Sequence, residues 1–210
     1  CTISGTGCGE NRLEDAFEAD LPGIGIQTSE ESSKIPYFAS DLCVTDTDVQ
    51  DIEADTEDAL AACFFNLSEK KVLYAKNIHE RMYPASTTKI MTLLVTLEHA
   101  DLDEIVEVSA RAASMPDVQL HIRKGERYRL QDLCYSLMLE SHNDSAVAIA
   151  EHVGGTVEGF PAMMNQKAKH LGCYHTYFIT PNGLDAEDEH GKHSTTARDL
   201  ARIMRCCIKN

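Results

Sequence analysis

A serine and a lysine stand three residues apart at the start of an apolar segment, in the run YPASTTKIMTLLVTLEHA. If this segment is helical, Ser86 and Lys89 share one face and their side chains can meet. Lowering the pKa of a lysine from about 10.4 to near 7 costs roughly 4 to 5 kcal/mol, which desolvation among leucines can supply. A neutral Lys89 could then take the hydroxyl proton of Ser86 and make that oxygen a nucleophile.

The same pattern also has a purely structural interpretation. Ser86 follows Pro84 and could simply cap the helix, while Lys89 extends to solvent. A second pair with this spacing, Ser68 and Lys71, lies in the charged turn LSEKK, and we attribute it to chance. Ser86 differs because the free N–H groups and the positive end of an apolar helix favour an oxyanion.

A second polar cluster, Ser141, His142 and Asn143, separates two apolar segments that we expect to be helices. A loop between two such helices lies near the core, so this cluster could face the helix that carries Lys89. By itself the cluster is better explained as a turn in which Asn143 or Asp144 caps the next helix. We expect His142 to face solvent and assign it no catalytic role.

The elements that must position these residues change in character along the chain. Residues 1–56 alternate small, polar and acidic residues, which predicts a mostly disordered linker with a short helix at NRLEDAFEADL. Two apolar runs, 59–67 and 72–75, flank the polar residues SEKK and predict a β-hairpin. The apolar spacing after Pro84 then predicts a helix that is buried on most sides.

Four further helices and three short extended pieces follow. Apolar spacing and closing glycines predict helices at 130–140, 144–153, 157–171 and from about 195 to 208. The extended pieces are EIVEVS, QLHIRKGERYRL and CYHTYFIT. Helices therefore dominate this part of the chain, and the predicted hairpin precedes them.

Composition excludes several classes of protein. The formal net charge is −15, and residues 1–58 hold 15 acidic and 2 basic residues, so nucleic-acid binding is disfavoured. No stretch approaches the roughly 18 consecutive apolar residues of a membrane span. Eight cysteines show no zinc-binding spacing, and Cys63 and Cys134 lie in apolar runs typical of small buried side chains. Because the chain does not start with methionine, we expect any export signal to lie outside it, and Cys1 could be the lipid-bearing cysteine of a processed lipoprotein.

Four runs together resemble a known family. YPASTTKIMT, LMLESHNDSAVAIAEHVGG, FITPNGLD and HSTTARDLA resemble, in order and rough spacing, the serine D-alanyl-D-alanine carboxypeptidases. These low-molecular-mass penicillin-binding proteins trim the stem peptide of peptidoglycan. The resemblance covers about residues 57–210, a partial catalytic domain, and leaves the 1–56 linker outside. It implies an α/β fold of the DD-peptidase/β-lactamase-like (transpeptidase-like) type, with a helical cluster against a mainly antiparallel sheet.

The resemblance also implies roles for individual residues. Ser86 would be the nucleophile that forms an acyl-enzyme, and Lys89 the base that activates it. Ser141 would relay a proton towards the leaving D-alanine, and Asn143 would bind both Lys89 and the amide of the substrate. The implied partners are peptidoglycan stem peptides ending in D-Ala-D-Ala and, as covalent inhibitors, β-lactam antibiotics. No cofactor and no metal is implied, and the site of action would be extracytoplasmic.

One family motif is absent from these residues. K-T-G does not occur, and the single Lys-Gly pair, Lys124 and Gly125, precedes Ser141 and is followed by Glu126. In the family this motif lies on a strand that supplies the second oxyanion donor, and losing one such donor costs about 10² to 10³ in rate. We therefore expect the C-terminal strands to be missing here and the isolated 210-residue piece to be impaired.

Three alternatives remain open from the sequence. A class A-like β-lactamase would need a glutamate to activate water, and Glu151 and Glu158 both lack the expected neighbours. A non-catalytic relative could bind cell-wall peptide through the same cleft. The run LDAEDEHGKH, which contains His190 and His193, could hold a metal, although such mixed ligands in a loop are more often solvated.

Overall fold

The computed structural model describes residues 48–50, 52–69 and 71–209. The predicted helix at NRLEDAFEADL and most of the predicted linker lie outside these residues. The described chain forms two compact units. The first contains residues up to 81 together with 169–175 and the segment from 196 onward, and the second contains 82–168 and 176–195.

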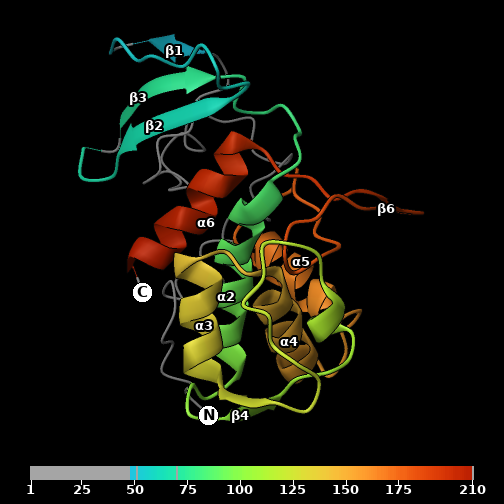
Figure 1. Ribbon diagram of the computed structural model, residues 1–210. Helices are drawn as coiled ribbons and strands as arrows, with labels where there is room; N and C mark the ends of the chain where they lie inside the picture. Colours follow the sequence, from blue (N-terminus) through green and yellow to red (C-terminus); the bar gives the residue numbers. More distant parts are fainter. Residues whose placement is uncertain (1–47, 51, 70, 210) are drawn as a thin grey trace, which may run out of the picture. The chain divides into compact units, whose positions relative to one another are not determined.

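The first unit contains the predicted β-hairpin. Strand β2 (Ala62–Asn66) pairs antiparallel with β3 (Lys71–Lys76), as expected from the two apolar runs (Figure 1). The Asn66 side chain closes the turn, because its Oδ1 accepts the N–H groups of Ser68 and Glu69. On the other side of β3 lies the short strand β1 (Val49–Gln50), which belongs to the segment that the sequence assigned to the linker.

Helix α6 (Ala197–Lys209) completes this unit. Thr196 caps it by accepting the N–H of Asp199, so the helix begins two residues after the predicted start near 195. Ala197 packs against the small apolar cluster of Val72, Ala75 and Ile78. The register of the hairpin shifts between Phe64 and Phe65, so Val72 and Ala75, which are three residues apart, can join one cluster at the start of this helix.

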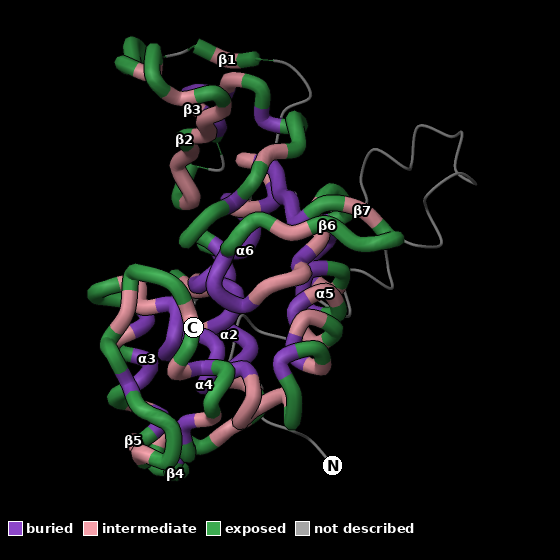
Figure 2. Tube along the Cα trace, turned by 45° about the vertical axis from the view of Figure 1, so that its right-hand side comes forward, coloured by how far each residue is buried: buried purple, intermediate pink, exposed green. Residues whose placement is uncertain are grey.

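The second unit is mainly helical. Its helices are α2 (Thr88–His99), α3 (Leu130–Leu139), α4 (Asn143–Gly154) and α5 (Phe160–His170). Helices α2, α3 and α4 pack on one another, and buried residues run along α2 and α4 (Figures 1 and 2). The first eight residues of α4 are all buried. The predicted helices at 130–140 and 144–153 are confirmed within one residue at each end.

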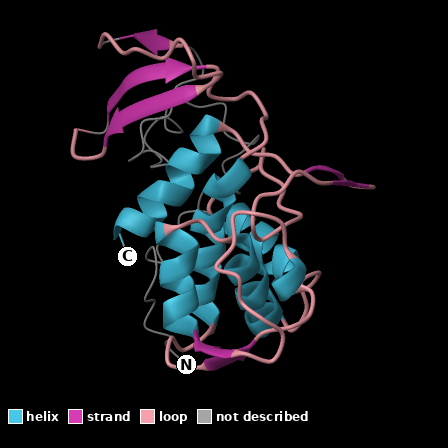
Figure 3. Ribbon diagram, viewed as in Figure 1, coloured by secondary structure: helices cyan, strands magenta, loops and turns pink. Residues whose placement is uncertain are grey.

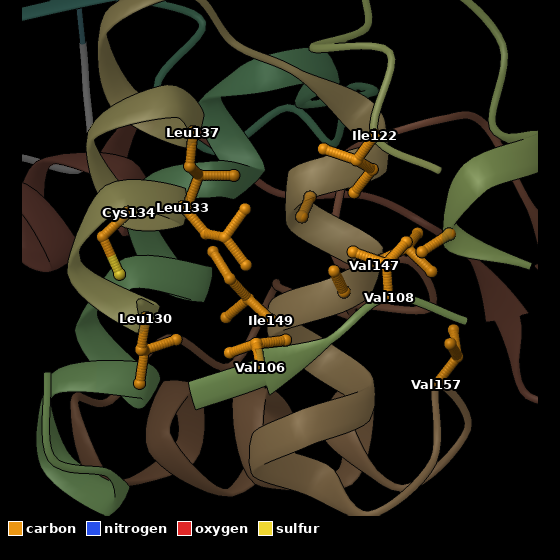
Figure 4. Packing of buried hydrophobic residues seen from close by; sticks show 13 residues of the cluster. Val106, Val108, Ile122, Leu130, Leu133, Cys134, Leu137, Val147, Ile149 and Val157 are labelled. Carbon is orange, nitrogen blue, oxygen red and sulfur yellow. The ribbon is translucent and has the colours of Figure 1, made fainter. Parts of the chain in front are cut away.

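The core of this unit lies between α3, α4 and a short β-ribbon. Strands β4 (Ile105–Glu107) and β5 (Arg127–Arg129) pair antiparallel. Figure 4 shows the leucines of α3 directed towards Ile149 of α4 and Val106 of β4. Since Leu130, Leu133 and Leu137 recur at spacings of three and four, they line one helix face and are almost fully buried. The helix–helix contact that results fixes the loop between α3 and α4.

The structure corrects one helix boundary. The sequence predicts a helix over 157–171, but α5 begins at Phe160. The three preceding residues form a turn in which Thr156 accepts the N–H of Gly159, and Gly155 at φ 72° ends α4. A Cβ at Gly154 would lie 2.7 Å from the Phe160 nitrogen, so the chain reverses too tightly there for the helix to start earlier.

The remaining extended pieces carry little regular structure. Of the predicted piece CYHTYFIT, only Tyr177 forms a bridge, with Ser194. A separate hairpin of β6 (Glu187–Asp188) and β7 (Gly191–Lys192) lies between them in the chain (Figure 3). All strand pairings among the described residues are antiparallel, as the predicted fold class requires. None of the described helices has the length and apolar character needed to cross a bilayer.

Candidate active site

The candidate nucleophile lies just before α2. Ser86 sits in the 3-10 turn η3 (Ala85–Thr87), and not in the first α-helical turn that the sequence predicts. The turn is tight: Ala85 has a φ of 47°, and the N–H of Thr87 donates to the Pro84 carbonyl at 3.1 Å. Ser86 is exposed. Its hydroxyl is therefore accessible to a substrate, although the helix that follows it is mostly buried.

Lys89 lies in the first turn of α2 and is 2% exposed. Its Nζ donates to the Ser86 Oγ at 3.0 Å. Desolvation by burial lowers the pKa of Lys89 to about 8, somewhat above the value near 7 that the sequence analysis assumed. With this pKa about a tenth of the lysine is neutral at pH 7. A buried amine with a lowered pKa therefore lies within hydrogen-bond distance of an accessible serine hydroxyl.

Asn143 completes the arrangement from the first residue of α4. Its Oδ1 accepts a hydrogen bond from Lys89 Nζ at 2.9 Å. Its Nδ2 donates to the carbonyls of Pro116 and Asp117, and its backbone N–H donates to the Val118 carbonyl. Because the amide nitrogen faces two carbonyls, which only accept, the amide oxygen must face the lysine. Both sides of the Asn143 amide are therefore oriented by the fold.

Asp144 holds the neighbouring loop in place. Its carboxylate is buried and accepts the N–H groups of Leu120, Ile122 and Ser145. Together with Asn143 it ties residues 116–122 to the start of α4. The sequence analysis named Asp144 only as a possible cap and did not anticipate this loop. The anchoring supplies partners for backbone N–H groups in the long segment between β4 and β5.

Ser141 lies in the sharp turn between α3 and α4. Its φ of 59° is a left-handed conformation, which is strained for a residue with a Cβ, and such strain is concentrated at functional sites. The residue is half-buried, and within the described chain its side chain makes no hydrogen bond, including none to Ser86 or Lys89. The structure therefore brings Ser86, Lys89 and Asn143 into direct contact and places Ser141 two residues from that chain of bonds.

His142 does not simply face solvent, as the sequence analysis expected. It is half-buried, and its Nδ1 lies 2.7 Å from the Ser136 Oγ. Ser136 also lies 2.7 Å from the Ser145 Oγ. Ser136 of α3 thus contacts both His142 and Ser145 of α4. His142 therefore helps to hold the turn that carries Ser141.

The sequence analysis missed the buried imidazole of His193. It placed this residue in a solvated loop, which is wrong, because His193 is 0% exposed. Its Nε2 lies 2.9 Å from Thr88 Oγ1, at the start of α2. His193 is the first residue of the run HSTTARDLA, which the sequence analysis used only for the family resemblance. Burial of a single polar residue leaves no periodic apolar pattern in the sequence, so it could not be predicted.

Other pairs singled out from the sequence lie elsewhere. Ser68 is exposed in the β2–β3 turn, and Gly125 occupies an open turn at φ 85°. Glu158, one of the two glutamates considered for a β-lactamase, is largely exposed and pairs with Arg111. None of these residues joins the Ser86–Lys89–Asn143 chain of hydrogen bonds.

This arrangement is suited to acyl transfer. It combines an exposed hydroxyl, a buried amine of lowered pKa at 3.0 Å and an amide that orients the amine. Activation of a serine by an adjacent base is the general requirement for forming a covalent ester intermediate.

Comparison with known proteins identifies the family of this chain. The family profile described as "Peptidase_S11: D-alanyl-D-alanine carboxypeptidase" matches residues 48–210. The D-alanyl-D-alanine carboxypeptidase DacF of Bacillus subtilis is 38% identical over 157 residues, which is 72% of this chain and 39% of that protein. The chain thus spans about two fifths of the length of this relative.

Two solved structures show the same fold. The D-alanyl-D-alanine carboxypeptidase DacD from Francisella tularensis is 30% identical with a TM-score of 0.68, over 80% of this chain and 40% of that one. Penicillin-binding protein D2 from Listeria monocytogenes, in its ampicillin-bound form, is 28% identical with a TM-score of 0.62, over 72% of this chain and 62% of that one. The predicted α/β fold of the DD-peptidases is therefore confirmed, and the chain belongs to the peptidase S11 family, the D-alanyl-D-alanine carboxypeptidases.

Proposed function

We propose that this protein is a serine D-alanyl-D-alanine carboxypeptidase that removes the terminal D-alanine from peptidoglycan stem pentapeptides. The observation that supports the proposal best is the chain of hydrogen bonds from Ser86 Oγ to Lys89 Nζ and on to Asn143 Oδ1, with Lys89 buried. Because the chain spans only part of the length of its relatives, we propose this activity for the whole protein of which these residues form a part.

In the first step Ser86 attacks the carbonyl carbon of the penultimate D-alanine. Its Oγ forms an ester bond to that carbon, and its proton passes to the neutral amine of Lys89, 3.0 Å away. The bond from the carbonyl carbon to the nitrogen of the terminal D-alanine breaks. Lys89 returns its extra proton through the Ser141 hydroxyl to the leaving nitrogen, a role for Ser141 that rests on the family resemblance. The N–H of Ser86 supplies one donor to the oxyanion.

In the second step water hydrolyses the ester. The water oxygen bonds to the same carbon and gives up a proton to Lys89, and Ser86 leaves as the hydroxyl after regaining a proton. Asn143 holds the amine in line in both steps, because its Oδ1 accepts from Lys89 Nζ at 2.9 Å. Asn143 would also bind the amide of the substrate.

Two further properties follow from this proposal. β-Lactams would acylate Ser86 as covalent inhibitors, and the ampicillin-bound form of the similar Listeria protein supports this. The stem peptide lies outside the cytoplasmic membrane, so the protein would act in an extracytoplasmic location. Membrane association, if it occurs, would use segments outside these 210 residues.

A fluorescent penicillin tests the proposal directly. We expect covalent labelling of the longest form that the gene encodes, since these residues hold no Lys-Thr-Gly, and its complete loss in Ser86→Ala. The chain offers a matched control in Ser68→Ala, which alters the other serine three residues before a lysine and should label normally. Failure of the native protein to label, or labelling that persists in Ser86→Ala, would contradict the proposal.

A further inference from the structure

The imidazole of His193 links two segments of the second unit that lie far apart in sequence. Its Nδ1 lies 2.9 Å from the backbone nitrogen of Ile179 and 3.3 Å from that of Thr180, and both N–H groups donate to it. Its Nε2 lies 2.9 Å from Thr88 Oγ1. The side chain is fully buried, and its bond to Thr88 is shielded from water, whereas the bonds to Ile179 and Thr180 are partly buried.

These contacts fix the tautomer of the ring. Backbone N–H groups only donate, so Nδ1 must be unprotonated to accept from Ile179 and Thr180. The ring proton therefore lies on Nε2, and His193 donates to the hydroxyl oxygen of Thr88. Burial lowers the pKa of His193 to about 4, against a smaller opposite effect of Asp185, so the ring is neutral near pH 7.

Two more contacts bring the same segment against the turn that carries Ser86. Thr92 Oγ1 donates to the Pro181 carbonyl at 2.6 Å. Gly183, at φ 85°, lies so close that a Cβ there would be 1.9 Å from the Ala85 carbonyl oxygen and 3.1 Å from Thr88 Oγ1. The segment 179–183 therefore packs directly on the turn Ala85–Thr87 and on the residue that follows it.

We propose that His193 is a positioning residue for the nucleophile: by donating to Thr88 it holds the turn that keeps Ser86 Oγ 3.0 Å from Lys89 Nζ. The inference rests on the proposed acyl-enzyme function. His193 hydrogen-bonds neither Ser86 nor Lys89 and acts only through Thr88, the residue between them and the segment 179–183. Thr88 is itself fully buried, so its hydroxyl lies away from the protein surface.

Loss of the bond between His193 and Thr88 should lower the acylation rate constant and leave the affinity of the initial non-covalent complex unchanged. A displacement of a nucleophile by about 1 Å costs roughly 10²-fold in rate, whereas binding of the ligand before the reaction depends on other contacts. We therefore expect the acylation rate constant for a fluorescent penicillin to fall about 10- to 100-fold. The dissociation constant of the initial non-covalent complex should stay unchanged, which a merely destabilised fold would not produce.

Paired substitutions separate the bond to Thr88 from the bonds to Ile179 and Thr180. His193→Gln can keep a donor near the position of Nε2, whereas His193→Asn keeps an acceptor near Nδ1 and loses the donor. On the other side, Thr88→Ser keeps the hydroxyl and Thr88→Val removes it with little change of shape. We expect slow acylation in His193→Asn and Thr88→Val, and recovery of most of the rate in His193→Gln and Thr88→Ser.

The double variant and a control complete the test. Since both changes remove one bond, His193→Asn with Thr88→Val should be no slower than either change alone. Asn165→Ala is the matched control, because Asn165 also joins two segments through partly buried hydrogen bonds to the Phe178 backbone but makes no hydrogen bond to the turn of Ser86. It should lower the Tm and leave the acylation rate constant unchanged.

The outcomes separate this inference from the proposed function. Undiminished acylation in His193→Asn and Thr88→Val, in a native protein that labels, would overturn the inference alone. Equal losses in the Gln and Asn variants, or multiplicative losses in the double variant, would overturn it too. Absence of labelling in the native protein would overturn the proposed function and the inference together.

Discussion

Lys89 shows how a single buried side chain acquires a chemical role. Its amine has two hydrogen-bond partners, Ser86 Oγ and Asn143 Oδ1, and both are neutral. No carboxylate hydrogen-bonds to it or forms an ion pair with it among the described residues, so desolvation is not offset and the pKa falls to about 8. By contrast, the other fully enclosed lysine of the second unit, Lys167, forms an ion pair with Glu98 at 2.7 Å. The two buried lysines therefore differ in their partners, since Lys89 contacts neutral groups and Lys167 contacts a carboxylate.

The acylation rate should therefore depend on pH through Lys89. The protonated amine cannot accept the serine proton, so the rate should rise with pH and level off above about pH 8. Below that value it should fall close to tenfold per pH unit. The measurement is the acylation rate constant for a fluorescent penicillin between pH 6 and pH 10. A rate that does not change across this range would contradict the assignment of Lys89 as base.

At the residue scale, the candidate site residues that could be predicted from the sequence are those that lie in short motifs. Ser86 and Lys89 drew attention because serine and lysine at helical spacing in an apolar setting require an explanation, whereas the role of Asn143 came only from the family resemblance. His193 could not be predicted, since its burial results from packing of a segment without periodic apolar residues. The supporting contact to Thr88 joins residues 105 positions apart, which no local pattern encodes.

At the scale of elements, helices α2 and α5 are joined by a buried ion pair. Lys167 Nζ and Glu98 Oε1 lie 2.7 Å apart, and the two side chains are 5% and 6% exposed. A buried charge that loses its partner keeps its desolvation penalty, so removing one member of such a pair destabilises more than removing both. The pair therefore makes the packing of α5 on α2 specific.

We expect Lys167→Met to lower the free energy of unfolding by about 3 to 5 kcal/mol, because it leaves the Glu98 carboxylate buried without its cation. The double variant Glu98→Met with Lys167→Met should recover more than half of that loss. Urea unfolding measures both quantities.

The exposed pair of Arg129 and Asp103 is the matched control, with side chains 51% and 77% exposed. Arg129→Met should change the urea midpoint far less than Lys167→Met, since solvent screens the pair. If the double variant were as unstable as the single one, the buried pair would not be coupled as described.

Helix positions could be predicted from the sequence better than helix starts. The leucines of α3 and the closing glycines of α4 located both helices within one residue at each end. Val157 and Glu158 look helical in the sequence, yet they lie in the turn that Thr156 and Gly159 form before α5. The start of α5 depends on the close approach of Gly154 to Phe160, a contact that the apolar pattern does not contain.

At the scale of the whole molecule, all the proposed site residues lie in the second unit, between 82 and 195. The family match begins earlier, at residue 48, and includes the strand β1. Asp48 and Thr56 make three further contacts within the first unit. The Thr56 hydroxyl lies 2.6 Å from the Tyr74 hydroxyl, Lys76 donates to the Thr56 carbonyl, and Asp48 accepts the N–H of Asn77.

This boundary can be tested with two truncations. A chain that begins at residue 59 loses β1 and the contacts of Thr56, whereas a chain that begins at 48 retains them. We expect the shorter chain to be less stable by about 2 to 3 kcal/mol, or roughly 5 to 10 °C in Tm. Thermal unfolding of both measures the difference, and Thr56→Val in the longer chain should give a smaller decrease. Equal Tm values would show that β1 contributes nothing to the sheet.

The bond between His193 and Thr88 has a consequence for synthesis of the protein. A growing chain emerges from the ribosome with its N-terminal part first, at about 5 to 20 residues per second. Thr88, which follows the turn of Ser86, therefore leaves the ribosome 105 positions before the imidazole that supports it. Until the segment 179–193 has followed, the serine and lysine are both present but the nucleophile has not been set in place. A nascent chain arrested before residue 179 should thus react with penicillin no faster than a simple serine peptide does.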